Sequence, residues 1–139
     1  MNIQSEPFNW VKERHACSIE AVFERLKLGV QSDVEERQQL RERGEFGFES
    51  SFTFTPTIDR FSASVRTHDS GRAVVFCLRR NRNHIVILDD NNKEMMSATV
   101  TLTDDRECRI VVGLEIIEEW QFRKRALEFL FFGEVGESS

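Results

Sequence analysis

The chain has 139 residues and a formal net charge of −5, and its length is typical of one domain. Hydrophobic residues make up 40% and charged residues 31%, which excludes a disordered chain, because such chains lack the apolar content that offsets the entropy of folding. No apolar run approaches the roughly 20 residues that a membrane-spanning helix needs. We therefore predict one domain over residues 1–133, a flexible C-terminal tail over residues 134–139, and no membrane association.

Amphipathic helices are predicted before the sheet. Ser5 and Pro7 suit the start of a short first helix, because Ser caps a helix and Pro is tolerated in its first turn. Ser18 is a second N-cap, and apolar residues follow it at the helical spacing of three and four. These residues are Ile19, Val22, Phe23, Leu26, Val30 and Val34. Gly29 within the stripe predicts close packing or a bend, and the polar run over residues 35–43 predicts a linker.

From Phe46 to about Leu114 the apolar period becomes two residues, which is typical of strands with one buried face. Turns rich in Asn, Asp and Gly separate six such runs, and these short connections make neighbouring strands antiparallel. The runs over residues 72–79 and 84–89 are apolar on both faces, which predicts that the middle of the sheet is covered on both sides. We expect a six-stranded antiparallel meander that curls strongly.

Helical spacing returns over residues 115–132, and Gly133 is a natural helix end. One apolar stripe consists of Ile116, Trp120, Leu127 and Phe131, and a second consists of Phe122, Ala126 and Phe129. Two stripes are more than one sheet face can cover. The predicted fold is α+β, with an N-terminal helix or helix pair, the meander, and a C-terminal helix packed on the curled sheet.

The three cysteines, Cys17, Cys77 and Cys108, are odd in number and widely spaced, and they form no C-x-x-C pattern. This arrangement predicts reduced thiols and argues against both a disulfide framework and a structural zinc site. The first residues lack the basic start and apolar stretch of a signal peptide. We therefore expect a cytoplasmic location.

No catalytic, metal-binding or nucleotide-binding motif stands out. His15 and Cys17 lie two positions apart, so on a helix their side chains point in different directions. His68 and His84 could approach each other across a hairpin, but a metal site needs a third protein ligand. We expect no metal and no cofactor, and we favour a protein that is not an enzyme.

Arginine is concentrated in one segment of the predicted sheet. Between Asp59 and His84 there are six arginines and two acidic residues. Guanidinium groups bind phosphates and carboxylates through paired hydrogen bonds, so five of the arginines are candidate anion-binding residues. These are Arg60, Arg66, Arg79, Arg80 and Arg82. Nucleic-acid binding is disfavoured, because neither exposed aromatic residues nor a Gly-rich loop accompanies them.

Twelve Phe and no Tyr predict dry aromatic contacts. The favoured hypothesis is a small interaction domain that forms a homodimer, or binds another protein, through a surface of Phe122, Phe129 and Phe132. One alternative is a carrier or enzyme that binds a small apolar ligand in a Phe-lined pocket between the sheet and the last helix. The other is an anion or nucleic-acid binder that uses the arginines.

Overall fold

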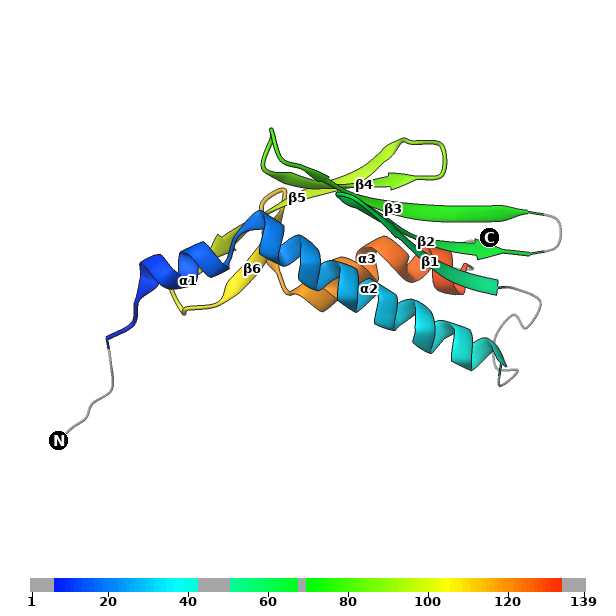
Figure 1. The fold of residues 1–139 in the computed structure, drawn as a ribbon, viewed down its shortest axis with the longest axis horizontal. Helices are drawn as coiled ribbons and strands as arrows, with labels where there is room; N and C mark the ends of the chain where they lie inside the picture. Colours follow the sequence, from blue (N-terminus) through cyan, green and yellow to red (C-terminus); the bar gives the residue numbers. More distant parts are fainter. Residues whose placement is uncertain (1–6, 43–50, 68–69, 134–139) are drawn as a thin grey trace.

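The computed structural model describes residues 7–42, 51–67 and 70–133, and the predicted tail lies outside them. The α+β prediction is confirmed, since helices precede and follow an antiparallel sheet (Figure 1). The helices are α1 (Trp10–Ala16), α2 (Ile19–Glu42) and α3 (Glu119–Phe132). The strands are β1 (Ser51–Thr57), β2 (Arg60–Arg66), β3 (Gly71–Arg79), β4 (His84–Asp89), β5 (Glu94–Leu102), β6 (Cys108–Val112) and β7 (Glu115–Ile117).

The starts and ends of the first two helices are set by their caps and by the apolar stripe. α1 begins later than predicted, because Asn9 rather than Ser5 caps it by accepting a hydrogen bond from the Lys12 backbone N–H. Ser18 caps α2 as predicted, with its Oγ 3.1 Å from the Ala21 nitrogen. The prediction of a linker from residue 35 is wrong as far as Glu42, because α2 continues to this residue and the Arg37 side chain is buried. None of the helices among the described residues has the length and apolar content needed to span a membrane.

The strands follow one another in chain order, and every neighbouring pair is antiparallel. The prediction of six strands and of a last helix from residue 115 missed β7. Gly113, at a φ of 60°, helps reverse the chain after β6, so Ile116 pairs with Val111 instead of entering a helix. β1 also continues through Pro56, which is tolerated because β1 lies at the edge of the sheet. Residues 46–50, predicted as its start, lie outside the described residues.

Both long helices cover the same face of the sheet (Figure 1). α2 contacts β1, β2, β4 and β5, and α3 contacts β2, β3 and β6. No helix of the described chain lies over the second face, so the predicted cover on that side is not a helical layer. Cys77, Val86 and Leu88 on that face form a small apolar cluster of their own with Val75, because the register places them side by side across β3 and β4.

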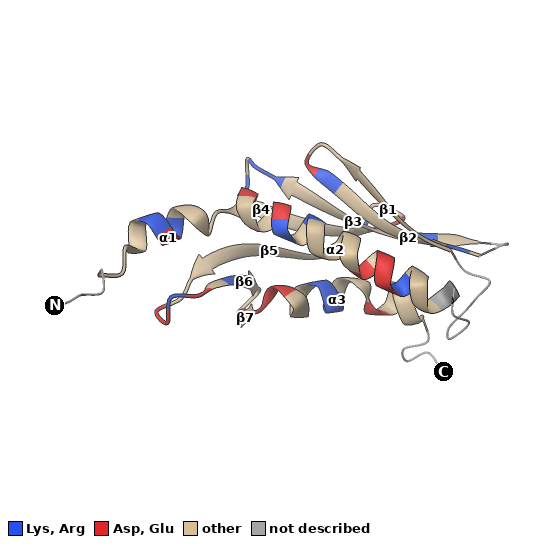
Figure 2. Ribbon diagram, turned by 60° about the horizontal axis from the view of Figure 1, so that its bottom comes forward, with Lys and Arg blue, Asp and Glu red and all other residues tan. Residues whose placement is uncertain are grey.

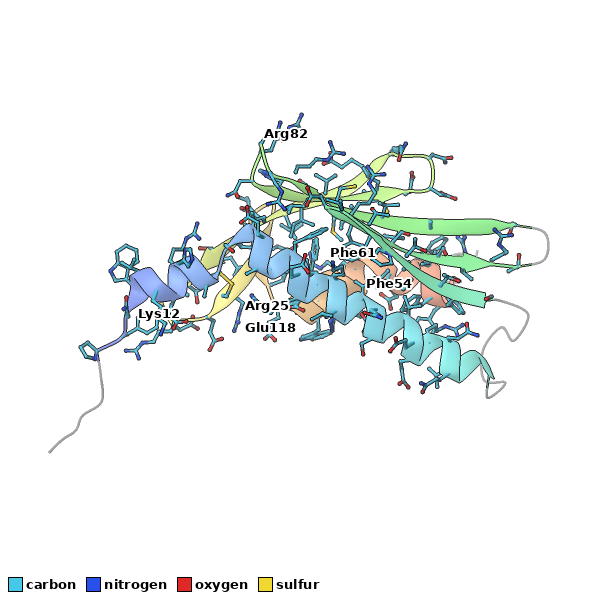
Figure 3. The ribbon with its side chains drawn as sticks, in the orientation of Figure 1. Lys12, Arg25, Phe54, Phe61, Arg82 and Glu118 are labelled. Atoms are coloured by element: carbon cyan, nitrogen blue, oxygen red, sulfur yellow. A yellow bond between two sulfur atoms is a disulfide. The ribbon has the colours of Figure 1, made fainter. Side chains whose placement is uncertain are left out.

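Four phenylalanine rings connect the helices to the sheet. The Phe23 ring of α2 lies 4.9 Å from Phe61 of β2, and Phe61 stacks on Phe76 of β3 at 4.7 Å. Phe76 in turn meets the edge of Phe122 of α3 at 6.4 Å. Figure 3 shows Phe61 between the sheet and the helices. Phe61, Phe76 and Phe122 have no exposed surface, so this chain of rings forms the centre of the core.

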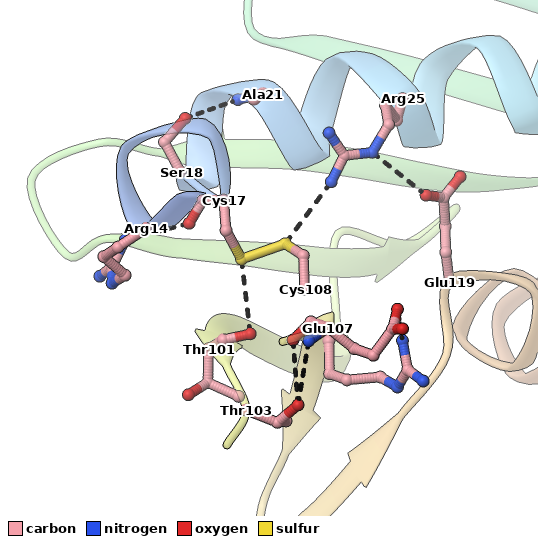
Figure 4. The surroundings of a disulfide bond; sticks show 11 residues. Arg14, Cys17, Ser18, Ala21, Arg25, Thr101, Thr103, Glu107, Cys108 and Glu119 are labelled. Atoms are coloured by element: carbon pink, nitrogen blue, oxygen red, sulfur yellow. Dashed lines mark hydrogen bonds and ion pairs between the residues drawn. A yellow bond between two sulfur atoms is a disulfide. The ribbon is translucent and has the colours of Figure 1, made fainter. Parts of the chain in front are cut away.

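A disulfide bond joins Cys17, at the C-cap of α1, to Cys108 at the start of β6 (Figure 4). The prediction of reduced thiols is wrong for these two residues and holds for Cys77, which is free and buried. An odd number of cysteines and their wide spacing do not reveal which pair meets in space. Here the junction between α1 and α2 lies against β5 and β6, where Cys17 Sγ is also 3.4 Å from the Thr101 carbonyl oxygen.

Replacing Phe61 with Ala is expected to lower the free energy of unfolding by about 3 to 5 kcal/mol, because it removes a fully buried ring and leaves a cavity. Phe129→Ala is the matched control. Its ring is 51% exposed, so we expect a change within about 1 kcal/mol. Urea denaturation of both variants measures these values, and losses of similar size would contradict the central role of Phe61.

Removing the disulfide is expected to lower the free energy of unfolding by about 2 to 4 kcal/mol, because the bond closes a long loop in the unfolded chain. The loop joins residues separated by 91 positions. Denaturation midpoints of the wild-type chain with and without reductant, and of the double variant Cys17→Ala/Cys108→Ala, test this. Reductant should not affect the double variant, and an unchanged wild-type midpoint after full reduction would count against the prediction.

Candidate functional site

The five predicted anion-binding arginines do not form one cluster. Arg60 and Arg79 lie at the end of the sheet where β2 begins and β3 ends, and Arg82 occupies the tip of the β3 to β4 turn (Figure 3). Arg66 lies at the other end of β2, roughly 20 Å away at about 3.4 Å per residue. Within the described residues these four arginines make no ion pair, and all are exposed.

Arg80 is committed to contacts within the chain. Its Nη2 lies 2.8 Å from Asp59 Oδ1, its Nε donates a hydrogen bond to Asp59 Oδ2, and its Nη1 lies 3.4 Å from Glu20 Oε2. The hydrogen bonds from Arg80 lower the pKa of the Asp59 carboxyl group. Arg80 therefore ties two turns of the sheet to the start of α2, and its role as an anion-binding residue stays a prediction.

Of the three residues predicted to form the interaction surface, two are exposed and one is buried. Phe122 has no exposed surface, so its inclusion is wrong: the α3 residues that face the core are Phe122, Ala126, Leu127 and Leu130. Phe129 and Phe132 remain 51% and 44% exposed, and Trp120, a member of one of the two predicted apolar stripes, is 52% exposed. The outer face of α3 thus carries three half-exposed aromatic side chains.

Ion pairs cross the contact between α2 and α3, where acidic and basic residues of both helices lie close together (Figure 2). Arg123 Nε is 3.1 Å from Asp33 Oδ2, and Arg25 Nε is 3.6 Å from Glu119 Oε1. Burial raises the pKa of Asp33, an effect that the charge of Arg123 opposes. The Arg123 side chain lies across Gly29, where a Cβ atom would overlap its Nη1 and lie 2.9 Å from its Cδ. The predicted close packing at Gly29 is confirmed.

A groove of about 400 Å³ follows this contact between α2 and α3. Its apolar lining comes from both helices and includes Leu40, Trp120, Leu127, Phe131 and Phe132. Charged residues of both signs, among them Glu36 and Lys124, also line it. The groove therefore adjoins the exposed aromatic face of α3 and combines apolar area with a polar rim.

A second cavity, of about 290 Å³, lies where the end of α3 meets α2 and the ends of β1, β2 and β3. We call it the Phe-Arg pocket after its most distinctive lining residues, which are Phe52, Phe131, Phe132, Arg37 and Arg72. Thr67 and Ser70, whose hydroxyl oxygens lie 3.1 Å apart, add polar groups. A Phe-lined space between the sheet and the last helix is therefore present, with two cationic side chains in its wall.

Arg37 and Arg72 were not among the predicted site residues, although the sequence holds a signal for each. Arg37 follows Val30 and Val34 at helical spacing, so it continues the buried stripe of α2. Arg72 alternates with Val74 and Phe76, and its pairing with Val65 places it on the side of the sheet that faces the helices. Their charge suggested solvent exposure, and this was wrong for Arg37, which is only 5% exposed.

The other candidate chemistry finds no site in the described residues. Cys17 is in the disulfide bond, so it cannot act as a nucleophile with His15. His84 Nδ1 lies 2.7 Å from the Arg82 carbonyl oxygen in a turn, and His68 lies outside the described residues. No group of three or more His, Cys, Asp or Glu side chains in residues 7–42, 51–67 and 70–133 could hold a metal ion.

Gly29→Ala is expected to lower the free energy of unfolding by about 1 to 2 kcal/mol, although Ala normally stabilises a helix interior by about 1 kcal/mol relative to Gly. The reason is that the new methyl group displaces Arg123 from its ion pairs with Asp33 and Glu119. In the background of Arg123→Ala the same change should stabilise the protein. Chemical denaturation of the wild-type chain, the two single variants and the double variant tests this, and equal stabilisation in both backgrounds would refute it.

No protein-family model, curated protein or solved structure matches this chain. A functional assignment therefore has to rest on the geometry of the chain itself.

Proposed function

We propose that this domain is a non-enzymatic interaction module that forms a homodimer through the outer face of α3. The observation that carries the proposal is the half exposure of Trp120, Phe129 and Phe132 on one helix of 14 residues. Trp120 and Phe132 border the same groove, and Phe129 lies one turn before Phe132. Exposed apolar groups of this kind are typical of protein interaction sites. Aromatic residues are also enriched at the centre of such interfaces, where they supply much of the binding energy.

A second copy of the chain is a suitable partner for this face. In a two-fold symmetric contact the same surface of both subunits meets itself. α3 carries exposed rings and also forms one wall of the groove that contains Leu40 and Leu127. Rings of one subunit can therefore enter the groove of the other, and the two-fold axis repeats the contact. Charged residues beside the groove, such as Glu36 and Lys124, would form the polar rim.

The exposed arginines provide weaker support for nucleic-acid binding. Arg60, Arg79 and Arg82 lie near one end of the sheet, but a basic surface that binds single strands normally contains aromatic residues on which bases stack. The exposed aromatic side chains of α3 belong to another element and another face. The net charge of −5 also opposes general attraction to phosphate backbones.

The cellular location remains a prediction. We expected the cytoplasm from the sequence, and the bond between Cys17 and Cys108 weighs against it, because stable disulfides form mainly in oxidising compartments. We infer that the protein functions where thiols are oxidised. The redox state of these two cysteines in cells, measured by alkylation before lysis, decides between the two locations.

Sedimentation velocity at micromolar concentration tests the homodimer. The wild-type chain should sediment as a dimer, while Trp120→Glu and Phe129→Glu should sediment as monomers, because each places a charge in the interface. The matched control is Ile58→Glu, which alters a side chain that is 90% exposed in a turn of the sheet and should stay dimeric. A monomeric wild-type chain, or α3 variants as dimeric as the control, would refute the proposal.

A further inference from the structure

The Phe-Arg pocket combines an apolar wall with positive charge. The Arg37 guanidinium carbon lies 4.4 Å from the centre of the Phe52 ring and 5.3 Å from that of Phe132. Arg72 lies in the same way over Phe129, at 4.7 Å. Rings that stack on a guanidinium group occupy its flat face, whereas its N–H donors lie in its plane. Stacking therefore holds Arg72 in place and leaves its in-plane donors accessible to a ligand.

The two arginines differ in burial and in role. Arg37 is 5% exposed, and its Nε donates a hydrogen bond of 2.8 Å to the Phe131 carbonyl oxygen near the end of α3. Burial lowers the pKa of Arg37, which means that its positive charge is poorly solvated there. Arg72 is exposed at the start of β3 and makes no ion pair within the described residues. Arg37 thus holds the end of α3 against the pocket, and Arg72 supplies donors that an incoming anion can reach.

The rest of the pocket suits an apolar group. Phe52 and Val65 of the sheet and Leu130 of α3 are buried residues that line it, so an apolar body can lie against side chains that are already rigidly packed. A volume of about 290 Å³ is at the lower end of the range for small-molecule sites. The ligand must therefore be small, with one apolar part and one anionic end.

We propose that the Phe-Arg pocket binds a small organic carboxylate, with its apolar body between the sheet and the end of α3 and its carboxylate on Arg72. A carboxylate fits the planar fork of a guanidinium group through two parallel hydrogen bonds. The hydroxyl groups of Thr67 and Ser70 lie in the same wall. This pocket shares Arg37, Phe131 and Phe132 with the groove between α2 and α3, but Arg72, Thr67 and Ser70 line the pocket and not the groove. The inference does not rest on dimer formation.

Titration of the full-length protein with 4-phenylbutyrate, followed by amide NMR spectra, tests the proposal. The uncharged analogue 4-phenylbutyramide has the same apolar body, and inorganic phosphate supplies an anion without one. We expect 4-phenylbutyrate to shift the amide signals of Gly71 and Gly133, both of which line the pocket. The amide analogue should bind about ten- to one-hundred-fold more weakly, the range expected for hydrogen bonds to a charged group.

Arg72→Gln is the informative variant, because Arg72 is exposed at a strand end and its replacement should leave the fold intact. It should weaken 4-phenylbutyrate binding about tenfold or more. The matched control is Arg66→Gln on the neighbouring strand: its side chain is exposed and does not line the Phe-Arg pocket, so binding should be unchanged.

Several results would overturn the proposal. These are a lack of binding at millimolar 4-phenylbutyrate, equal affinity for the acid and the amide, and unchanged affinity in Arg72→Gln. Phosphate binding as tight as that of the carboxylate would refute the role of the apolar wall. A loss of binding in Arg66→Gln equal to that in Arg72→Gln would show that only surface charge matters. None of these readouts is the oligomeric state, so a failure of this proposal and a failure of the homodimer proposal can be told apart.

Discussion

The stacking of Phe61 on Phe76, with ring centres 4.7 Å apart and planes inclined by 13°, is the contact on which the rest of the structure depends. Phe23 brings α2 to one side of this pair, and Phe122 brings α3 to the other. Each ring lacks a polar group, so the contacts between helices and sheet stay dry. The Phe-Arg pocket and the groove are the spaces left between elements whose positions these rings determine.

Arginine performs several different tasks around this core. Arg80 connects two turns to α2 through Asp59 and Glu20, and Arg123 crosses α2 at the one position where a glycine leaves room for it. Arg37 is buried beside aromatic rings, where its aliphatic stem packs among apolar side chains and its planar guanidinium group stacks on Phe52. Arg72 combines ring stacking with access to solvent at the wall of the Phe-Arg pocket, and this is why we place the anion there.

The one-sided arrangement of the helices explains where the interaction surface lies. The sheet face that no described helix covers is lined with Ser, Thr and Arg around a small apolar cluster, and Cys77, Val86 and Leu88 in that cluster are already buried. The outer face of α3 is different, because its aromatic side chains stay half exposed although Arg72 stacks on Phe129 and Arg37 on Phe132. Three of the exposed large apolar side chains of the described chain, Trp120, Phe129 and Phe132, lie on the helix where we place the dimer contact.

The sequence alone determined the order of helices and strands, the buried stripe of α2 and the antiparallel pairing, because each follows from residues a few positions apart. It did not reveal β7, since three residues are too few to show a period of two. It also could not show that Arg37 is buried with Phe52 or that Arg72 lines the same pocket, because the rings that surround these charges come from other elements. Only the tertiary structure decided these features and the bond between Cys17 and Cys108, because contacts across 91 positions depend on how the elements pack and leave no local pattern in the chain.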